Sequence, residues 1–403
     1  MVQATSNSQS NFKKIRLALD GNEANVKNRV GSNAYAFEII KALWKLTARE
    51  PQISVITLLS TPPIADLPPE RTNWHYRVIT PKPFWTQWAL PLHLFWCRHE
   101  YDVLFTPGHY APRISAIPYI SSVMDLAFLK YPDSFAKKDY LQLKAWTEYS
   151  VKSAQKVVAI SNFTKQEIRR AYHRLDNDII VAPPSVTELN SRFNHHQFEK
   201  FCQKIGLSEP YFLYLGTLQP RKNLVSLIEA FEQIMMGSTS GVNPQSATVS
   251  DLKLVLAGKI GWLADEIIQK IAVSPVKNQI ILTGFISNQL KYPLYSHATA
   301  ALMLSPYEGF GIPALEAMAA GTLPIVANSS SLPEVVGKAG VLVNPNQVGS
   351  IANGLLQAFY MSETERATLK SLGKGRVKKF SWEASAKLIL KELVSLTDQS
   401  ISQ

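Results

Sequence analysis

The sequence predicts an α/β protein of two domains, each a mostly parallel sheet covered by helices, that face each other across a cleft. Its 403 residues exceed one ordinary domain and suit two, at roughly 150 residues each. Hydrophobic residues make up 46% of the chain, which is enough for two cores. Short apolar runs alternate with helix-like segments in two successive series, and this alternation is typical of parallel sheets.

The first series lies in the N-terminal half of the chain. Its strand-like runs are IRLALD, ISVITLL, YRVIT, VLFTP, PYISSVMD, KVVAIS and DIIVAPP, with a helix-like segment from Ser32 to Leu46. The series restarts with YFLYLG, LKLVLAG, QIILTGF, AALMLS, LPIVAN and AGVLVNP. A polar stretch near residues 185–208 separates the two and is interpreted as the linker.

These patterns set the expected domain boundaries. An N-terminal domain is expected over residues 13–190 and a C-terminal domain over residues 205–380, followed by a helix over residues 381–397. The stretch 237–250 is rich in Ser, Thr and Gly, so we interpret it as a surface insertion without chemistry. Ligands of such sheets bind beyond the carboxyl ends of the strands, so informative residues should follow strands.

Charge and targeting signals narrow the classes of function. The net charge of +11 suits a phosphate-bearing ligand, a nucleic acid or an anionic membrane surface. No nucleic-acid module is present, and the cluster KGRVKK is interpreted as a solvated helix face. Cys97 and Cys202 lack metal or disulfide spacing, and no secretion signal or long apolar run occurs, so a cytoplasmic protein is expected.

The segment WTQWALPLHLFW, Trp85 to Trp96, allows two interpretations. A core helix broken at Pro91 is favoured over a helix that lies on a membrane surface. Peripheral contact with the inner face of a membrane is kept as a hypothesis, because the chain is basic and this segment is aromatic.

The loop EGFGIP links the strand AALMLS to a helix. Pro313 suits a first helical turn, so the helix should begin near Ile312 with Glu316 in its first turn. Ile312 provides no capping side chain, and free amides at a helix start form an anion site. Gly309 and Gly311 let a ligand approach the backbone closely.

Two carboxylates flank this anion site. Glu308 and Glu316 would repel phosphate but could accept hydrogen bonds from sugar hydroxyls. The loop therefore fits a molecule with a phosphate between two sugars. The alternative is structural, with Glu316 favouring a helix start and Glu308 capping a turn.

A second basic loop follows the strand YFLYL. Gly216 opens it, Arg221 and Lys222 come next, and Asn223 is expected to cap a helix. The two cations lie next to the positive end of the helix dipole, so an anion bound between them would reduce the repulsion. Arg can bind a diphosphate through two parallel hydrogen bonds. Solvated surface charge is the alternative.

Weaker signals lie elsewhere in the chain. Gly31 and Ser32 open the first long helix, with Ser32 as the expected N-cap. The DND of residues 176–178 precedes a strand, so we interpret it as a turn and not as a metal site. No residue cluster indicates a metal or another cofactor, and none is expected.

These motifs together resemble the retaining glycosyltransferases of family 4, which have the GT-B fold of two Rossmann-like domains. The resemblance is carried by GTLQPRKNL, EGFGIPALEAMAAGTLPIVA and SLPEVVGKAGVLVNP, and is looser over the N-terminal half. It implies that the N-terminal domain binds the acceptor and that the final helix crosses back to it.

The resemblance implies roles for single residues. Glu316 would bind the ribose of a nucleotide sugar, and Glu308 would face the donor hexose. Backbone groups of Gly309, Phe310, Gly311 and Ile312 would hold the hexose and the distal phosphate, while Gly216 and Gly31 would approach the donor. Arg221 and Lys222 would stabilise the leaving nucleotide without a metal.

One position departs from the family pattern. Many relatives carry a His before the Asp of Met124-Asp125. Methionine cannot transfer a proton, so an imidazole role is absent here. Asp125 could contact the sugar or acceptor, or it could simply end its strand.

The resulting hypothesis is a hexosyltransferase of polysaccharide biosynthesis. The resemblance favours mannose from GDP-mannose, with a UDP-hexose as the alternative donor, and a glycan or lipid-linked acceptor. Two rival hypotheses are a non-hydrolysing sugar-nucleotide epimerase and a non-catalytic sugar-nucleotide-binding subunit.

Overall fold

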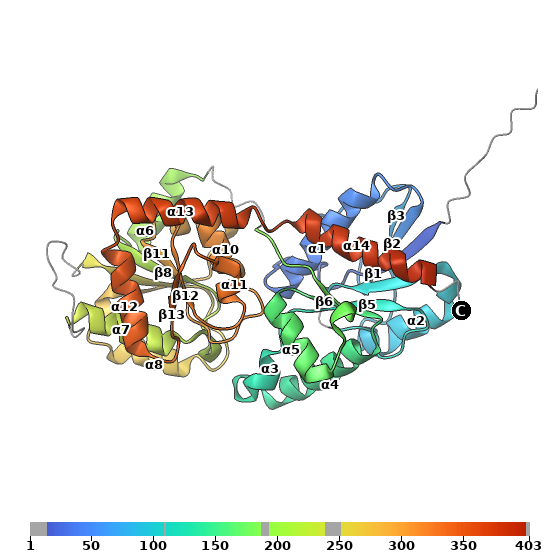
Figure 1. The fold of residues 1–403 in the computed structure, drawn as a ribbon, viewed down its shortest axis with the longest axis horizontal. Helices are drawn as coiled ribbons and strands as arrows, with labels where there is room; N and C mark the ends of the chain where they lie inside the picture. The colour runs from blue at the N-terminus through green and yellow to red at the C-terminus, as the bar shows by residue number, and fades with distance from the viewer. Residues whose placement is uncertain (1–13, 109, 187–192, 238–250, 400–403) are drawn as a thin grey trace, which may run out of the picture.

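The computed structural model describes residues 14–108, 110–186, 193–237 and 251–399, and shows two α/β domains joined in one chain (Figure 1). The N-terminal domain has a seven-stranded sheet in the order β3-β2-β1-β4-β5-β6-β7. The C-terminal domain has a six-stranded sheet in the order β10-β9-β8-β11-β12-β13. Every pairing between neighbouring strands is parallel, as the alternating pattern predicts.

Each apolar run predicted from the sequence forms a strand. The strands of the first sheet are β1 (Ile15–Asp20), β2 (Ile53–Leu59), β3 (Trp74–Val78), β4 (Val103–Thr106), β5 (Tyr119–Val123), β6 (Lys156–Ala159) and β7 (Ile179–Val181). Those of the second are β8 (Tyr211–Leu215), β9 (Lys253–Ala257), β10 (Ile280–Gly284), β11 (Ala300–Met303), β12 (Pro324–Ala327) and β13 (Val341–Val343). The proposed insertion at 237–250 lies almost wholly outside the described residues.

Helices cover both faces of the N-terminal sheet. One face packs against α1 (Ser32–Thr47) and α14 (Trp382–Gln399), and the other against α2 (Leu90–Trp96), α4 (Lys137–Ser153) and α5 (Asn162–Tyr172). The short helix α3 (Ala127–Lys130) follows β5. The faces separate because successive strand residues point to opposite sides, as Leu17 and Ala18 do.

The C-terminal sheet is covered in the same way. Its first face packs against α7 (Leu224–Met235), α8 (Asp265–Val273) and α12 (Val348–Phe359), and its second against α6 (His195–Ile205), α9 (Asn288–Ser296) and α10 (Ile312–Ala319). Helices α11 (Leu332–Val336) and α13 (Glu363–Val377) pack beside α10. The predicted linker thus contains a helix, α6, which belongs to this packing.

The last helix, α14, packs on the N-terminal domain although it follows the C-terminal one (Figure 1). Ala386, Ile389 and Leu393 are fully buried in the core beside α1. Ser385 Oγ donates a hydrogen bond to the Pro183 carbonyl at 2.7 Å. The chain therefore joins the two domains at two places, and the exact domain limits stay predictions.

Strand order locates the point in each sheet where a ligand is expected. In the N-terminal sheet the direction of winding reverses between β1 and β4, and in the C-terminal sheet between β8 and β11. Loops that leave the carboxyl ends of such strands form the binding crevice of doubly wound sheets. The loops after β8 and β11 are the two that the sequence singles out.

Three local predictions are wrong in detail. The helix α1 has Gly31, with a φ of 55°, as its N-cap, and the side chain of Ser32 instead donates to Glu23. Asn223 is the N-cap residue of α7, as expected, but it has a left-handed conformation and its side chain makes no capping hydrogen bond. The segment Trp85–Trp96 is not broken at Pro91, because a π-helical turn over Trp85–Ala89 runs directly into α2.

The last residue of β1 makes stability depend on pH. Burial raises the pKa of the Asp20 carboxyl from 3.8 to about 7, although hydrogen bonds from Asn22 offset part of this rise. Because this pKa is higher in the folded chain than in the unfolded one, stability falls as pH rises from 3.8 to about 7. The variant Asp20→Asn should gain stability over the native chain across this range, by at most about 4 kcal/mol.

Chemical denaturation at a series of pH values measures this gain. The exposed Asp133 is the matched control, and Asp133→Asn should leave the pH profile unchanged. Parallel profiles for native chain and Asp20→Asn would contradict the prediction.

Candidate active site

The loops after β8 and β11 are bound to each other at the carboxyl edge of the C-terminal sheet. Arg221 Nη1 donates to the Tyr307 carbonyl at 3.0 Å, and Ser305 Oγ donates to the Arg221 carbonyl at 2.9 Å. Asn223 Nδ2 donates to the carbonyls of Leu304 and Pro345 at 3.3 and 2.7 Å, so its side chain joins the two loops. The two sequence motifs therefore form one structure.

Glu308 lies between two cations, Arg221 and Lys222, of the loop after β8. Its carboxylate forms an ion pair with Lys222 and lies 3.8 Å from Arg221 Nη1. All three side chains are mostly buried, with exposed fractions of 12% for Glu308, 16% for Arg221 and 19% for Lys222. The interpretation of Arg221 and Lys222 as solvated surface charge is therefore wrong.

The charges of this cluster control its titration. Burial alone would raise the pKa of the Glu308 carboxyl, but the charges of Lys222 and Arg221 outweigh it and lower that pKa below its usual value. Burial alone would lower the pKa of the Arg221 guanidinium, but Glu308 and then Asp125 raise it. The Glu308 carboxyl and the Arg221 guanidinium therefore keep their charges at neutral pH.

Asp125 joins the cluster from the N-terminal domain. Its Oδ1 accepts a hydrogen bond from the Ala127 amide at 2.9 Å at the start of α3. A Cβ built on Gly309 would lie 2.9 Å from the Cβ of Asp125 and 2.0 Å from the Met124 carbonyl oxygen. Thr164 Oγ1 donates to the Gly309 carbonyl at 3.2 Å. Only glycine allows this close contact between the domains.

The start of α10 carries no side-chain cap, as expected. Gly311 is its N-cap, with a φ of 107°, and a Cβ there would lie 2.6 Å from Leu332 Cδ2. Phe310 is buried and packs edge to face on Phe380, and Ile312 is the first helical residue. Ser331 Oγ donates to the carbonyls of Glu308 and Phe310 at 2.8 Å each, which fixes the loop ahead of the helix.

Glu316 has a different set of partners from Glu308. It is the fifth residue of α10, so its predicted place in the first turn is wrong by one position. Its carboxylate lies 3.2 Å from Lys291 Nζ and accepts a hydrogen bond from the Tyr295 hydroxyl at 3.1 Å, both from α9. The two motif glutamates are thus held by separate cationic partners.

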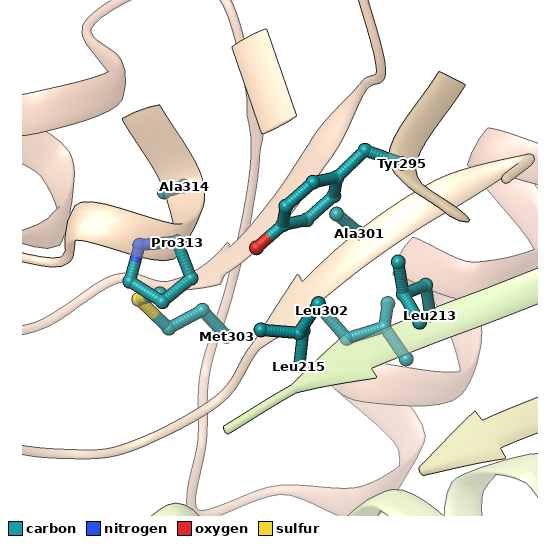
Figure 2. A pocket seen from close by; sticks show the side chains of 8 residues that line it. All are labelled: Leu213, Leu215, Tyr295, Ala301, Leu302, Met303, Pro313 and Ala314. Carbon is teal, nitrogen blue, oxygen red and sulfur yellow. The ribbon is translucent and has the colours of Figure 1, made fainter. Parts of the chain in front are cut away.

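A small cavity lies under the start of α10, between β8, β11 and Tyr295 (Figure 2). Its volume is about 10 Å³, and its lining is apolar apart from the Tyr295 hydroxyl. This volume holds at most one water molecule. It is a gap in packing and not a place for a substrate.

The two remaining predicted glycines lie in different surroundings. Gly216 packs closely on its neighbouring strand, because its carbonyl oxygen lies 1.9 Å from a Cβ built on Gly258. Gly31 is exposed at the start of α1, and a Cβ there would meet nothing within 4 Å. The contacts of Gly31 do not join it to the Glu308 cluster.

Sequence reasoning missed several residues that hold the domains together. Glu334 accepts hydrogen bonds from the amides of Asn162 and Phe163 at 2.8 and 3.1 Å, and so caps α5 of the opposite domain. Tyr307 is buried against Phe163 with 5.1 Å between ring centroids. Glu334 lies inside the motif SLPEVV, so the sequence indicates that this segment matters. The sequence does not indicate that the partner of Glu334 is the start of α5, which depends on how the two domains are arranged.

The chain is similar to known glycosyltransferases. Residues 196–374 match the family model described as glycosyl transferases group 1. The chain is 28% identical over 292 residues to O-antigen chain mannosyltransferase B of Escherichia coli. The match covers 72% of this chain and 73% of that protein. The chain is 30% identical over 226 residues to O-antigen chain mannosyltransferase RfbU of Salmonella typhimurium, over 56% of each protein.

A solved structure shares the fold. The Anabaena protein Alr3699/HepE, solved in complex with UDP and glucose, superposes with a TM-score of 0.68 at 20% identity. The match covers 95% of this chain and all of that one.

The fold and these matches define a glycosyltransferase of the GT-B class. Its C-terminal domain carries, over residues 196–374, a glycosyl transferases group 1 domain.

The contact at Gly309 should be essential for holding the domains together. In Gly309→Ala the new methyl group would overlap the Met124 carbonyl, so the domains must separate or the loop must shift. We expect the variant to lose roughly 1–3 kcal/mol in the free energy of unfolding. Chemical denaturation measures this loss, and small-angle scattering measures the separation.

Gly375→Ala is the matched control, because a Cβ at that helical position meets nothing within 4 Å. It should be neutral or slightly stabilising. If Gly309→Ala unfolded and scattered like the native chain, the close contact would not exist in solution.

Proposed function

We propose that this glycosyltransferase moves a hexose, with mannose favoured, from a nucleotide diphosphate sugar to a glycan or lipid-linked acceptor in polysaccharide assembly. The reaction proceeds with retention of configuration and without a metal, in the cytoplasm. The observation that carries the proposal is the buried cluster of Arg221, Lys222 and Glu308 beside Asp125 of the opposite domain.

The donor diphosphate would bind at the two cations. Arg221 can donate two parallel hydrogen bonds to phosphate oxygens, and Lys222 adds a point charge. The uncapped start of α10 supplies further backbone donors at Gly311 and Ile312 next to the same loop. These groups would neutralise the charge that develops on the leaving phosphate as the bond to the anomeric carbon breaks.

The two glutamates would bind sugars on either side of the diphosphate. When phosphate oxygens bind Arg221 and Lys222 in place of Glu308, the Glu308 carboxylate can accept hydrogen bonds from hexose hydroxyls. Glu316, oriented by Lys291 and Tyr295, would accept from the ribose hydroxyls. The separate partners of the two carboxylates support separate roles.

The acceptor would approach from the N-terminal domain. Asp125 lies beside Gly309 and close enough to Arg221 to raise the pKa of its guanidinium, so it borders the place where the hexose would sit. Met124 is buried in the core and contributes its backbone carbonyl at the domain contact. We therefore propose that the acceptor attacks from the face that the leaving phosphate occupies, and that its hydroxyl proton passes to that phosphate and not to a side chain at position 124.

The printed names of the relatives support the choice of sugar. Two relatives are O-antigen chain mannosyltransferases, so GDP-mannose is the favoured donor. The HepE structure contains UDP and glucose, so a UDP-hexose is the alternative.

A donor screen tests the proposal. In the presence of a chelator, the preferred sugar nucleotide should raise the unfolding temperature of the chain and be turned over with an acceptor. The variants Arg221→Ala and Glu316→Ala should each reduce kcat/KM by about 10²-fold or more, because each removes charge-assisted contacts to the donor. Thermal shift and product analysis by mass spectrometry are the measurements.

The exposed Arg49 is the matched control, and Arg49→Ala should keep full activity. Full activity in Arg221→Ala would contradict the site assignment. An epimer formed from the donor without acceptor would support an epimerase instead of a transferase. A donor that binds but is never turned over would support a non-catalytic binding subunit.

A further inference from the structure

One helical segment of the N-terminal domain is apolar on two opposite faces. It comprises the π-helical turn Trp85–Ala89 and α2, which continue without a break. One face, with Trp85, Leu90 and Leu94, is buried in the core against the sheet. A surface helix normally presents polar residues on its other face, and this one does not.

The solvent face carries a continuous apolar row. Trp88 and Trp96 are 67% and 72% exposed, and the complete row is Phe84, Trp88, Leu92, Phe95 and Trp96. Phe84, Trp88 and Leu92 are spaced by four residues, and Phe95 and Trp96 follow Leu92 by three and four, so these side chains share one side of the segment. A contiguous exposed cluster of large apolar side chains on a globular protein indicates an interaction surface.

The start of the segment is held in an unfavourable backbone conformation. Phe84 has a φ of 54° and a ψ of 33°, a left-handed conformation that bulky residues rarely adopt. Its side chain is exposed, so core packing does not explain the conformation. The Trp85 indole, which donates to the Ile79 carbonyl at 3.0 Å, fixes the following turn. The chain thus presents Phe84 outward at a cost in backbone energy.

The charges around the row select its partner. The stretch from Lys82 to His99 contains no Asp or Glu, and its exposed ends carry Lys82, Arg98 and His99. Arg98 lies over the Phe95 ring, with 5.4 Å from its Cζ to the ring centroid. Tryptophan at an apolar boundary with Lys and Arg beside it suits the interface of a bilayer with anionic headgroups.

We infer that the face formed by Phe84, Trp88, Leu92, Phe95 and Trp96, here called the aromatic face, binds the surface of an anionic lipid bilayer. Helix α2 lies on the side of the sheet opposite α1 and α14, away from the C-terminal domain (Figure 1). Binding there would leave the Glu308 cluster free. No helix among the described residues is long and apolar enough to cross a membrane. The aromatic face would attach the chain peripherally, with its rings at headgroup depth.

Cosedimentation with vesicles tests the inference on the full chain. The native chain should bind vesicles of phosphatidylcholine with phosphatidylglycerol more strongly than phosphatidylcholine alone, and salt should weaken this preference. The triple variant Trp88→Ser/Leu92→Ser/Trp96→Ser should lower the partition coefficient at least about tenfold. Its control is Leu175→Ser/Val273→Ser/Leu388→Ser, which changes exposed apolar residues elsewhere and should bind like the native chain.

The cationic contribution has its own pair of variants. Lys82→Glu/Arg98→Glu should weaken binding to the anionic vesicles at least about fivefold. Arg49→Glu/Lys277→Glu makes the same change in net charge at exposed sites away from the aromatic face and should have a smaller effect. Circular dichroism and thermal unfolding confirm that each variant folds.

Three results would overturn the inference: no binding of the native chain to anionic vesicles, unchanged binding of the triple variant, or a dimer that the triple variant abolishes without any vesicle binding. The inference does not rest on the proposed donor chemistry. A chain that binds vesicles but no sugar nucleotide would refute only the proposed function. A chain that binds and turns over a sugar nucleotide but does not bind vesicles would refute only the membrane binding of the aromatic face.

Discussion

The buried carboxylate of Glu308 between Arg221 and Lys222 is the interaction on which the rest of the site depends. Charges in a largely dehydrated place are stable only when they are paired, because an unpaired buried charge is costly. The pairing of Glu308 with Lys222 requires the loops after β8 and β11 to meet, although 86 residues separate the two. Adjacent parallel strands at the point where the winding reverses bring them together. The fold thus creates a cationic place that a diphosphate can share.

The same loop also joins the two domains. Glu308 faces the cations, Gly309 touches the Met124 carbonyl, and Tyr307 is buried against Phe163. Any ligand that moves this loop therefore acts on the domain contact, and the Glu334 carboxylate adds two hydrogen bonds from backbone amides of α5 across it. A shift of this loop would therefore change the proposed donor site and the proposed acceptor side together. The aromatic face lies away from this loop, so mutations there should change membrane binding without changing sugar transfer.

The sequence predicts the architecture well because its strands are buried on both faces and read as continuous apolar runs. The resemblance implies that Arg221, Lys222 and Glu308 serve one donor, and the structure brings the three side chains together. Prediction from the sequence fails at the starts of two helices: α1 has Gly31 and not Ser32 as its N-cap, and the Asn223 side chain does not cap α7 although Asn223 is its N-cap residue. It misses Lys291, Tyr295 and Glu334, whose partners are set by the packing of helices and domains. It also could not assign one face of Trp85–Trp96 to the core and the other to solvent.

The proposed function requires the cations of the cluster to bind a nucleoside diphosphate without a metal. Calorimetric titration of GDP and GMP, with UDP and UMP in parallel, into the native chain in the presence of a chelator measures this binding. We expect the preferred diphosphate to bind at least about tenfold more tightly than its monophosphate, because the second phosphate gains charge-assisted contacts. Equal affinities for the two, or diphosphate binding that requires an added divalent metal, would contradict it.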